Sequence, residues 1–243
     1  ITVEGKGKDI CGLRYRMQVS PLDCTGCGNC ADICPAKENA LIMKSLEELS
    51  TLEDANFRFA ESLPEPDVEI SPSTVRGSQY QKPLFEYSGA CAGCGETPYI
   101  KVITQLFGNR MIVANATGCS SIYGGNAPTV PYTVDNRGRG PAWASSLFED
   151  NAEFGYGYSL AVTQQRAKLI ELVTALTQTG ISAQLKEALE NWLTVKDDGD
   201  ASLKAADQVR ELLEAETPQA DNKDLIGQVK ERATFLPKRS IWI

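Results

Sequence analysis

The 243-residue chain contains no histidine. This absence excludes Ser-His-Asp and Cys-His catalysis within the chain, and it excludes any metal site with an imidazole ligand. No apolar run approaches the roughly 18 residues that a membrane-spanning helix needs, and the start of the chain shows no signal-peptide pattern. Acidic residues outnumber basic ones by 32 to 24, and the net charge of −8 argues against nucleic-acid and anionic-membrane partners.

Eight cysteines are present, and most of them lie in tight clusters. Clustered thiols without a signal peptide suit a reducing compartment better than a secreted disulfide scaffold, so we expect a cytoplasmic protein. The chain begins at Ile1 and ends in Ile241-Trp-Ile243, which has the character of the beginning of a buried strand. We therefore expect a fragment of a longer polypeptide.

The most informative stretch carries four cysteines with the spacing C-x2-C-x2-C-x3-C-P. This spacing is typical of bacterial ferredoxins, in which three thiolates hold one [4Fe–4S] cluster and the fourth serves a neighbouring cluster. We therefore predict that Cys24, Cys27 and Cys30 share one cluster and that Cys34 binds another.

Gly26 and Gly28 lie between these cysteines, where glycine allows tight turns and leaves backbone amides free to face the sulfides. The alternatives for the run are a zinc knuckle or a set of disulfides. Zinc sites usually use paired C-x2-C hooks that a longer spacer separates, and four cysteines this close do not match that arrangement. The spacing therefore favours iron–sulfur ligation.

Composition divides the chain into two parts. A stretch rich in proline, serine and charged residues, 61–83, predicts a linker between a ferredoxin-like domain in residues 1–60 and a second domain in residues 84–243. The elements expected in the first domain are strands over residues 13–19 and 40–43 and a helix over residues 45–57 with Ser45 as its cap.

The second domain begins with an α/β pattern and ends with a helical one. Thr97 is expected to cap a helix that ends near Phe107, and residues 111–115 predict a buried strand. Small residues then predict an open loop over residues 117–125, of the kind that lets the backbone approach a ligand. The remaining predictions are structured loops over residues 126–158 and helices over residues 160–180, 182–193, 203–216 and 224–233.

A second C-x2-C hook is formed by Cys91 and Cys94, and Cys119 lies in the glycine-flanked loop after the predicted strand. Three thiolates are one short of a cluster held by four cysteines. A redox dithiol and a structural zinc site are the alternatives for this hook. Glu96 is either a carboxylate beside a cofactor or an ordinary acidic residue favoured at a helix start. Cys11 has no C-x2-C partner and stays unassigned.

Four stretches carry a wider likeness, and they occur in the order 24–35, 88–97, 116–121 and 140–157. Together they resemble the pyruvate:ferredoxin (flavodoxin) oxidoreductase family, and the likeness covers essentially the whole chain. The resemblance implies an α/β fold, with a partial ferredoxin-like α+β module followed by an incomplete thiamine-diphosphate-binding domain.

The same resemblance implies a reaction and a set of site residues. The family decarboxylates pyruvate on thiamine diphosphate, transfers the acetyl group to coenzyme A and passes electrons singly through [4Fe–4S] clusters to ferredoxin or flavodoxin. By this likeness Cys91, Cys94 and Cys119 hold the cluster nearest the thiamine diphosphate, and Glu96 and Cys119 line that cofactor. A homodimer of the full-length enzyme is also implied.

Several parts of the family pattern have no counterpart in this sequence. By the resemblance, the other ferredoxin cysteine run lies before Ile1, whereas the fourth proximal-cluster ligand and the Mg²⁺ ligands lie after Ile243. No catalytic residue is therefore assigned, and the chain alone is expected to be inactive. The alternatives are a non-catalytic iron–sulfur electron-transfer subunit and, more weakly, a zinc-stabilised scaffold. The glycine- and aromatic-rich stretch 137–157 favours a cofactor pocket over a pure relay.

Overall fold

The computed structural model describes residues 2–64 and 70–243. Residues 65–69 of the predicted linker lie outside the described residues. The mixture of helices with a small parallel sheet confirms the α/β fold class. No helix within the described residues is long and apolar enough to cross a bilayer.

The chain forms two compact units of packing. Unit 1 comprises Ile1–Leu106 and Pro131–Thr133, and unit 2 comprises Phe107–Val130 and Val134–Ile243. The predicted domain boundaries stay a prediction, because units of packing need not coincide with domains.

Unit 1 contains short elements and little buried apolar surface. Among its described residues, the buried apolar side chains are Ile10, Ala31, Leu84 and Phe85. A core this small supplies little of the burial that stabilises a domain. The elements are β1 (Val3–Glu4), η1 (Lys8–Ile10), β2 (Arg14–Tyr15), α1 (Asn29–Asp32), α2 (Leu46–Glu61), α3 (Val75–Ser78) and most of α4 (Thr97–Phe107).

Of two strand predictions in unit 1, one was partly right and the other was wrong. Only Arg14–Tyr15 of residues 13–19 is a strand, and it pairs antiparallel with β1. Residues 40–43 form no strand in the described structure. Alternation is not sufficient for a strand, because a strand also needs a neighbour for its backbone hydrogen bonds.

Two helix predictions in unit 1 were partly right. The helix expected over residues 45–57 is confirmed as α2 and extends to Glu61, but the Ser45 side chain makes no capping hydrogen bond. Thr97 is the first residue of α4 rather than its cap, and its hydroxyl accepts a hydrogen bond from Ser88 Oγ at 3.2 Å. The predicted linker also contains a helical turn, α3, in which Gly77 and Ser78 are buried and whose cap Thr74 accepts from Gly77 N.

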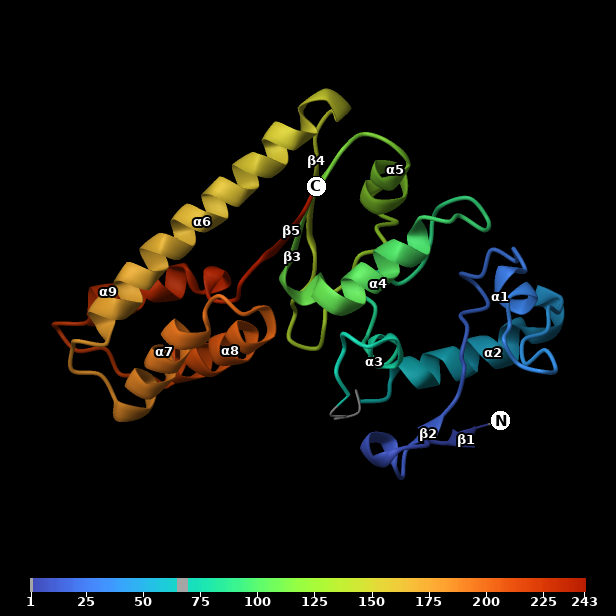
Figure 1. Ribbon diagram of the computed structural model, residues 1–243, viewed down its shortest axis with the longest axis horizontal. Coiled ribbons are helices and arrows are strands. Elements are labelled where there is room, and N and C mark those ends of the chain that lie inside the picture. Colours follow the sequence, from blue (N-terminus) through green and yellow to red (C-terminus); the bar gives the residue numbers. More distant parts are fainter. Residues whose placement is uncertain (1, 65–69) are drawn as a thin grey trace. The chain divides into compact units, whose positions relative to one another are not determined.

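Unit 2 is built around a parallel three-stranded sheet. The strand order is β4–β3–β5, with β3 (Met111–Asn115) between β4 (Ala142–Ser145) and β5 (Ser240–Trp242). Helices α5 (Cys119–Gly125) and α6 (Asn151–Leu176) lie on opposite sides of this sheet (Figure 1), as expected when right-handed crossovers lead to opposite edges. The short helices of unit 2 are η2 (Gly108–Arg110), η3 (Phe148–Asp150) and η4 (Ala233–Phe235). The strands predicted over residues 111–115 and from Ile241 are confirmed.

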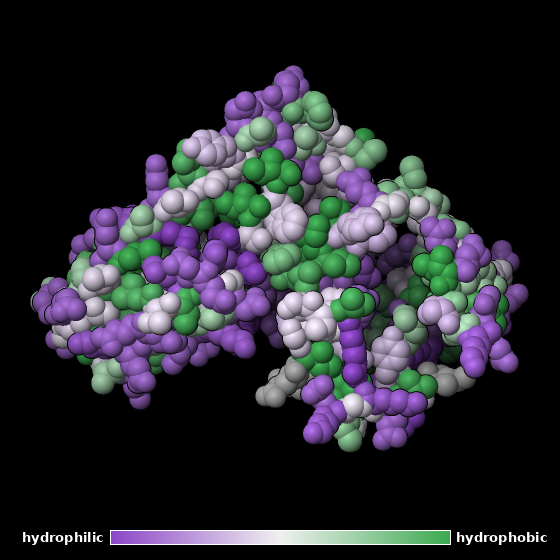
Figure 2. Space-filling model, viewed as in Figure 1, coloured by the Kyte–Doolittle hydropathy of each residue, from purple (hydrophilic) through white to green (hydrophobic). Residues whose placement is uncertain are grey.

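Most of the buried apolar surface of unit 2 belongs to a group of helices at one end of α6. Helices α7 (Ala183–Val195), α8 (Gly199–Ala215) and α9 (Lys223–Glu231) gather there (Figure 1). Their amphipathic spacing was readable from the sequence. The fully buried large side chains include Leu169, Leu176, Leu185, Leu189, Trp192, Val209, Leu213, Ile226 and Val229. Hydrophilic side chains cover much of the region of α7 and α8 on the face that Figure 2 shows.

Two predictions of loops in unit 2 were wrong. Residues 119–125 form helix α5, and residues 126–158 contain β4 and the first turns of α6, which begins at Asn151 rather than Leu160. Two of the glycines that suggested loops, Gly125 and Gly155, serve close packing instead. A Cβ on Gly155 would lie 2.4 Å from the side chain of Ile243, so glycine lets that side chain approach α6. Tertiary packing overrides local propensity here.

Candidate metal centre

The cysteine run folds as a loop that leads into α1. Gly26 and Gly28 have positive φ angles of 69° and 82°, so the predicted tight turns are present. Cys24, Cys27 and Cys30 are exposed free thiols. The loop therefore leaves these three thiols accessible on a tightly turned backbone.

Cys24 and Cys30 line a cavity of about 370 Å³. Its walls are mostly apolar and come from residues near the cysteine run and from the start of α2. Thiols against an apolar wall suit a [4Fe–4S] cluster, because such a wall limits water access and tunes the reduction potential. The lining includes Met17, Val19, Pro21, Leu41, Ile42, Met43, Leu46 and Leu49.

The donor set and the thin core of unit 1 both fit a cluster. A bound cluster cross-links distant parts of a chain and so supplies stability that a small apolar core lacks. Backbone N–H groups of Ala36 and Ala40 lower the pKa of the Cys34 thiol, which favours the thiolate form that binds metal. Among the described residues, no three His, Cys, Asp or Glu side chains are grouped so that they could hold a metal ion.

The second hook, Cys91 to Cys94, lies against the first cysteine loop. It is a tight turn in which Cys94 N donates to Cys91 O at 3.0 Å and Gly93 has a φ of 72°. A Cβ built on Gly93 would lie 3.6 Å from Cys27 Cβ and 3.3 Å from Asn29 Nδ2. All of these residues belong to unit 1. The fold therefore brings together two cysteine motifs that are far apart in the sequence.

We expect Gly93→Ala to loosen the second hook. The left-handed conformation costs an L-residue about 1–2 kcal/mol, and the new methyl group would crowd Asn29. This cost corresponds to roughly tenfold faster amide hydrogen exchange in residues 88–97. Gly95→Ala is the matched control, because a Cβ there meets nothing within 4 Å and its φ is not positive. Equal exchange rates in the two variants would contradict the expectation.

Glu96 follows the hook and is exposed, and its carbonyl accepts from Tyr99 N at 3.0 Å as α4 begins. Tyr132 was not identified from the sequence. Its ring packs edge-on against Phe85, with centroids 5.3 Å apart. Burial and, secondarily, the charge of Glu96 raise the pKa of Tyr132 to about 12. The phenol is therefore a neutral hydrogen-bond donor at neutral pH.

Cys119 belongs to unit 2 and is the first residue of α5, just beyond the carboxyl end of β3. Hydrogen bonds join the ends of β3 and β4 next to it: Ser146 N donates to Asn115 O at 2.9 Å, and Thr117 Oγ1 donates to Ser146 O at 3.0 Å. Ligands of open α/β sheets bind outside the carboxyl ends of the strands. Cys119 is therefore placed where this fold class binds its ligands.

Helix α5 is held in place by Trp143 of β4. A Cβ on Gly125 would lie 2.4 Å from the Trp143 ring, so glycine permits the indole to pack against the end of α5. The Trp143 Nε1–H is buried and has no hydrogen-bond partner in the part of the chain that the structure describes. The ligand roles of Cys24, Cys27, Cys30, Cys34, Cys91, Cys94 and Cys119 and the cofactor role of Glu96 stay predictions.

Two family models match the chain. The model described as "4Fe-4S binding domain" matches residues 17–37, which contain the first cysteine run. The model described as "Pyruvate-ferredoxin oxidoreductase, insertion domain" matches residues 165–220, which cover the end of α6 together with α7 and α8.

Curated relatives match the chain over most or all of its length. "Pyruvate:ferredoxin oxidoreductase" of Moorella thermoacetica is 56% identical, and the match covers 100% of this chain and 21% of the relative. "Pyruvate-flavodoxin oxidoreductase" of Klebsiella pneumoniae is 47% identical over 94% of this chain and 19% of the relative. The mitochondrial "Pyruvate dehydrogenase [NADP(+)]" of Euglena gracilis is 42% identical over 100% of this chain and 13% of the relative.

The chain is thus related over its length to a segment of the pyruvate:ferredoxin and pyruvate-flavodoxin oxidoreductases, as the sequence motifs indicated. It spans about a fifth of the length of the first of these relatives.

Proposed function

We propose that this chain is the part of a pyruvate:ferredoxin or pyruvate:flavodoxin oxidoreductase that passes electrons from the cofactor to the first ferredoxin-type cluster. In the whole reaction pyruvate loses CO₂, its acetyl group passes to coenzyme A, and the electrons leave one at a time. A thiamine diphosphate bound by the complete enzyme would supply the carbanion chemistry. The described chain would supply cluster ligands and the scaffold that orients them.

The observation that carries this proposal is the contact between the two cysteine motifs of unit 1. The turn at Gly93, inside the Cys91–Cys94 hook, packs against Cys27. Clusters held by these two loops would be neighbours, and single-electron transfer needs neighbouring centres. A redox dithiol at the hook gives no reason for this contact with a second cysteine motif.

The residues of the chain fit part of a thiamine-diphosphate site. Cys119 and the joined ends of β3 and β4 lie at the carboxyl edge of a parallel sheet, where such folds bind phosphorylated ligands. We place Glu96 beside the cofactor, where its carboxylate would be a proton or hydrogen-bond acceptor. The Mg²⁺ ligands are proposed to lie in parts of the complete enzyme beyond this chain.

The partner proteins and the location of the enzyme are also proposals. The names of the relatives give different acceptors: ferredoxin, flavodoxin and NADP⁺. All three relatives nevertheless match most or all of this chain. The match to this segment therefore does not by itself select one acceptor. For the complete enzyme we propose ferredoxin or flavodoxin as acceptor, a homodimeric assembly and a cytoplasmic location.

The proposal is tested on the whole polypeptide that contains this chain, purified without oxygen. Iron and acid-labile sulfide are measured, and EPR spectra are recorded before and after addition of pyruvate with coenzyme A. We expect [4Fe–4S] signals that pyruvate reduces. Cys24→Ser should remove about four iron atoms per polypeptide, whereas the unassigned, exposed Cys11→Ser should remove none.

Two other results would favour the alternatives. Clusters that dithionite reduces but pyruvate does not would identify a non-catalytic electron-transfer subunit. Zinc in place of iron in anaerobically purified protein would identify a zinc-stabilised scaffold.

A further inference from the structure

Helix α8 makes contacts at the amino end of each strand of the parallel sheet. Arg110, the residue before β3, lies 3.6 Å from Asp200 through Nη2 and Oδ1. Arg139, three residues before β4, donates to both oxygens of Asp207 at 2.8 and 2.9 Å. Because the strands are parallel, their amino ends lie along one side of the sheet, which we call its amino edge, and these contacts lie there.

The third contact is made just before β5. Lys238 N donates to Ser202 Oγ at 2.9 Å, and Ser202 is fully buried on α8. Lys238 Nζ also donates to the carbonyl of Asp197, which lies just before α8. The strand starts are separated by long stretches of sequence, yet all three meet one helix.

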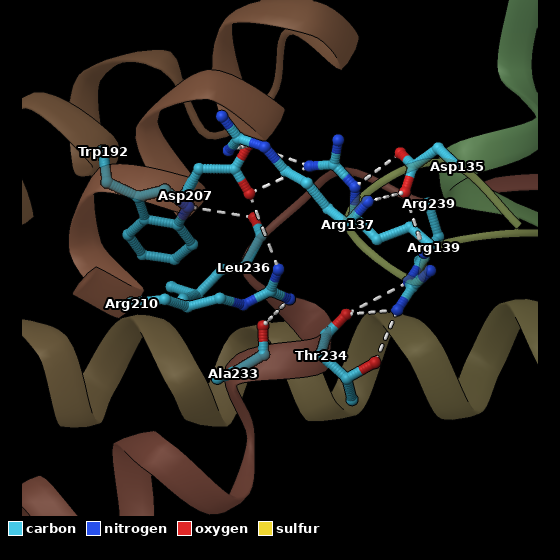
Figure 3. A network of polar contacts seen from close by, with 10 residues as sticks. All are labelled: Asp135, Arg137, Arg139, Trp192, Asp207, Arg210, Ala233, Thr234, Leu236 and Arg239. Atoms are coloured by element: carbon cyan, nitrogen blue, oxygen red, sulfur yellow. Dashed lines mark hydrogen bonds and ion pairs between the residues drawn. The ribbon is translucent and has the colours of Figure 1, made fainter. Parts of the chain in front are cut away.

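Asp207 is the centre of the strongest contact (Figure 3). It pairs with Arg137 and Arg139, and Arg210 Nη1 lies 3.8 Å away. The side chains of Asp207 and Arg139 are only 17% and 18% exposed, so solvent screens this pair less than an ordinary surface ion pair. Burial lowers the pKa of Arg139, but its hydrogen bonds to Asp135 and Asp207 outweigh this effect and raise it.

The same contact fixes the turn that leads into β4. Asp135 accepts from Arg139 N and Arg139 Nε at 2.9 Å each, which closes the turn between them. Arg139 therefore connects this turn to α8. A shift of α8 would be transmitted to β4 through two charged hydrogen bonds rather than through a flexible loop.

The contact at β3 depends on a glycine. A Cβ on Gly199, the first residue of α8, would lie 2.5 Å from Nη2 of Arg110. Arg110 is 11% exposed and also stacks over Phe107 at 5.2 Å from the ring centroid. The guanidinium of Arg110 thus fits between the Phe107 ring and the backbone of α8 at Gly199, where there is no side chain.

The opposite edge of the sheet carries the short Thr117–Cys119 loop, which leads from β3 into α5. The strands are short, and the register pairs Ile112 with Ala142 and Asn115 with Ser145. Beyond them, Thr117 and Ser146 are hydrogen-bonded to each other. The position of β4 relative to β3 at the amino edge therefore sets the geometry of the loop at the carboxyl edge.

We propose that α8 is a brace that fixes the amino edge of the sheet and thereby positions the Thr117–Cys119 loop, with Asp207 as its main positioning residue. The effect on electron transfer rests on the function proposed above, whereas the brace itself does not. The family model names this region an insertion domain. The contacts described above give it the role of holding the sheet in the position that the Thr117–Cys119 loop requires.

The test measures amide hydrogen exchange in the whole polypeptide. In Asp207→Asn we expect at least tenfold faster exchange over residues 134–146, and also over residues 115–121 at the opposite edge. Glu214→Gln is the matched control on α8, because Glu214 is 76% exposed and pairs only with Lys230 at 3.2 Å among the described contacts. Asp207→Glu should restore most of the protection.

A second variant separates the brace from the stability of α8 itself. Gly199→Ala raises helix propensity but displaces the Arg110 guanidinium. We expect faster exchange over residues 110–115 with no faster exchange within α8. Unchanged exchange at residues 115–121 in both Asp207→Asn and Gly199→Ala would overturn the proposal, as would an effect confined to α8.

Kinetics supply a second readout, with kcat expressed per folded enzyme because unfolded protein would also lower an apparent kcat at constant KM. We expect Asp207→Asn to lower kcat for pyruvate-dependent reduction about tenfold with an unchanged KM for the acceptor, and Asp207→Glu to recover it. If the unaltered polypeptide shows no pyruvate-dependent reduction, the proposed function fails, while the exchange experiment still decides whether α8 is a brace.

Discussion

Cys91→Ser is expected to remove one cluster from the whole polypeptide, a loss of about four iron atoms, and to abolish pyruvate-dependent reduction. Serine keeps the size of the side chain but is a far poorer ligand for iron than a thiolate. The hook turn packs against the Cys27 loop, so the lost cluster would be the neighbour of the first one. Electrons from the cofactor would then have no centre to enter. Iron analysis, EPR and turnover measure the three effects.

Cys11→Ser is the control, because Cys11 is an exposed free thiol without an assigned role. It should keep all of the iron and full turnover. Unchanged iron in Cys91→Ser would show that the hook is not a ligand and would favour the dithiol interpretation. Signals of the Cys24–Cys30 cluster should persist in Cys91→Ser, and their presence shows that unit 1 is still folded.

Trp192→Ala is expected to give the largest loss of stability. The side chain is fully buried among the helices of unit 2, and its Nε1 donates to Leu236 O at 2.9 Å. Truncation of a buried aromatic residue costs about 3–5 kcal/mol. The carbonyl of Leu236 would lose the indole as a donor but keep its hydrogen bond from Arg166 Nη1 at 3.1 Å. Amide exchange over α7 and α9 should accelerate by at least about a hundredfold.

Trp192→Phe separates the two contributions. Phenylalanine retains most of the buried area but cannot donate to Leu236 O, so we expect a cost of about 1–2 kcal/mol. Amide exchange is preferable to a single melting curve, because a chain with two units need not unfold in one step. Exchange rates in Trp192→Ala within threefold of the unaltered protein would show that α7–α9 do not depend on this side chain.

Local signals were the ones that could be read from the sequence. The four-cysteine run is decisive because the ligand spacing of a cluster is set within a dozen residues, and the family model found the same stretch. The cap of α7 is an equally local feature, since Ser182 Oγ accepts from Leu185 N three residues later. Helix periodicity likewise identified α7, α8 and α9.

Long-range packing could not be predicted from the sequence. Glycine indicated a loop at Gly155, but this residue is helical and makes room for Ile243, which is far away in the sequence. The approach of Gly93 to Cys27 and the position of Tyr132 near Glu96 depend on tertiary contacts that leave no local pattern. No local pattern distinguishes Asp207 from the other acidic residues of α8, although it is the centre of an arginine network.

The strand order β4–β3–β5 has a consequence for the order of folding. β3 and β4 are joined by a modest crossover, but β5 follows β4 only after all of α6, α7, α8 and α9. Contacts among these helices are local in sequence and form quickly, whereas the pairing of β3 with β5 closes a long loop and is slow. The helices should therefore assemble before the sheet is complete. The last strand would then be added to an edge whose neighbours are already aligned.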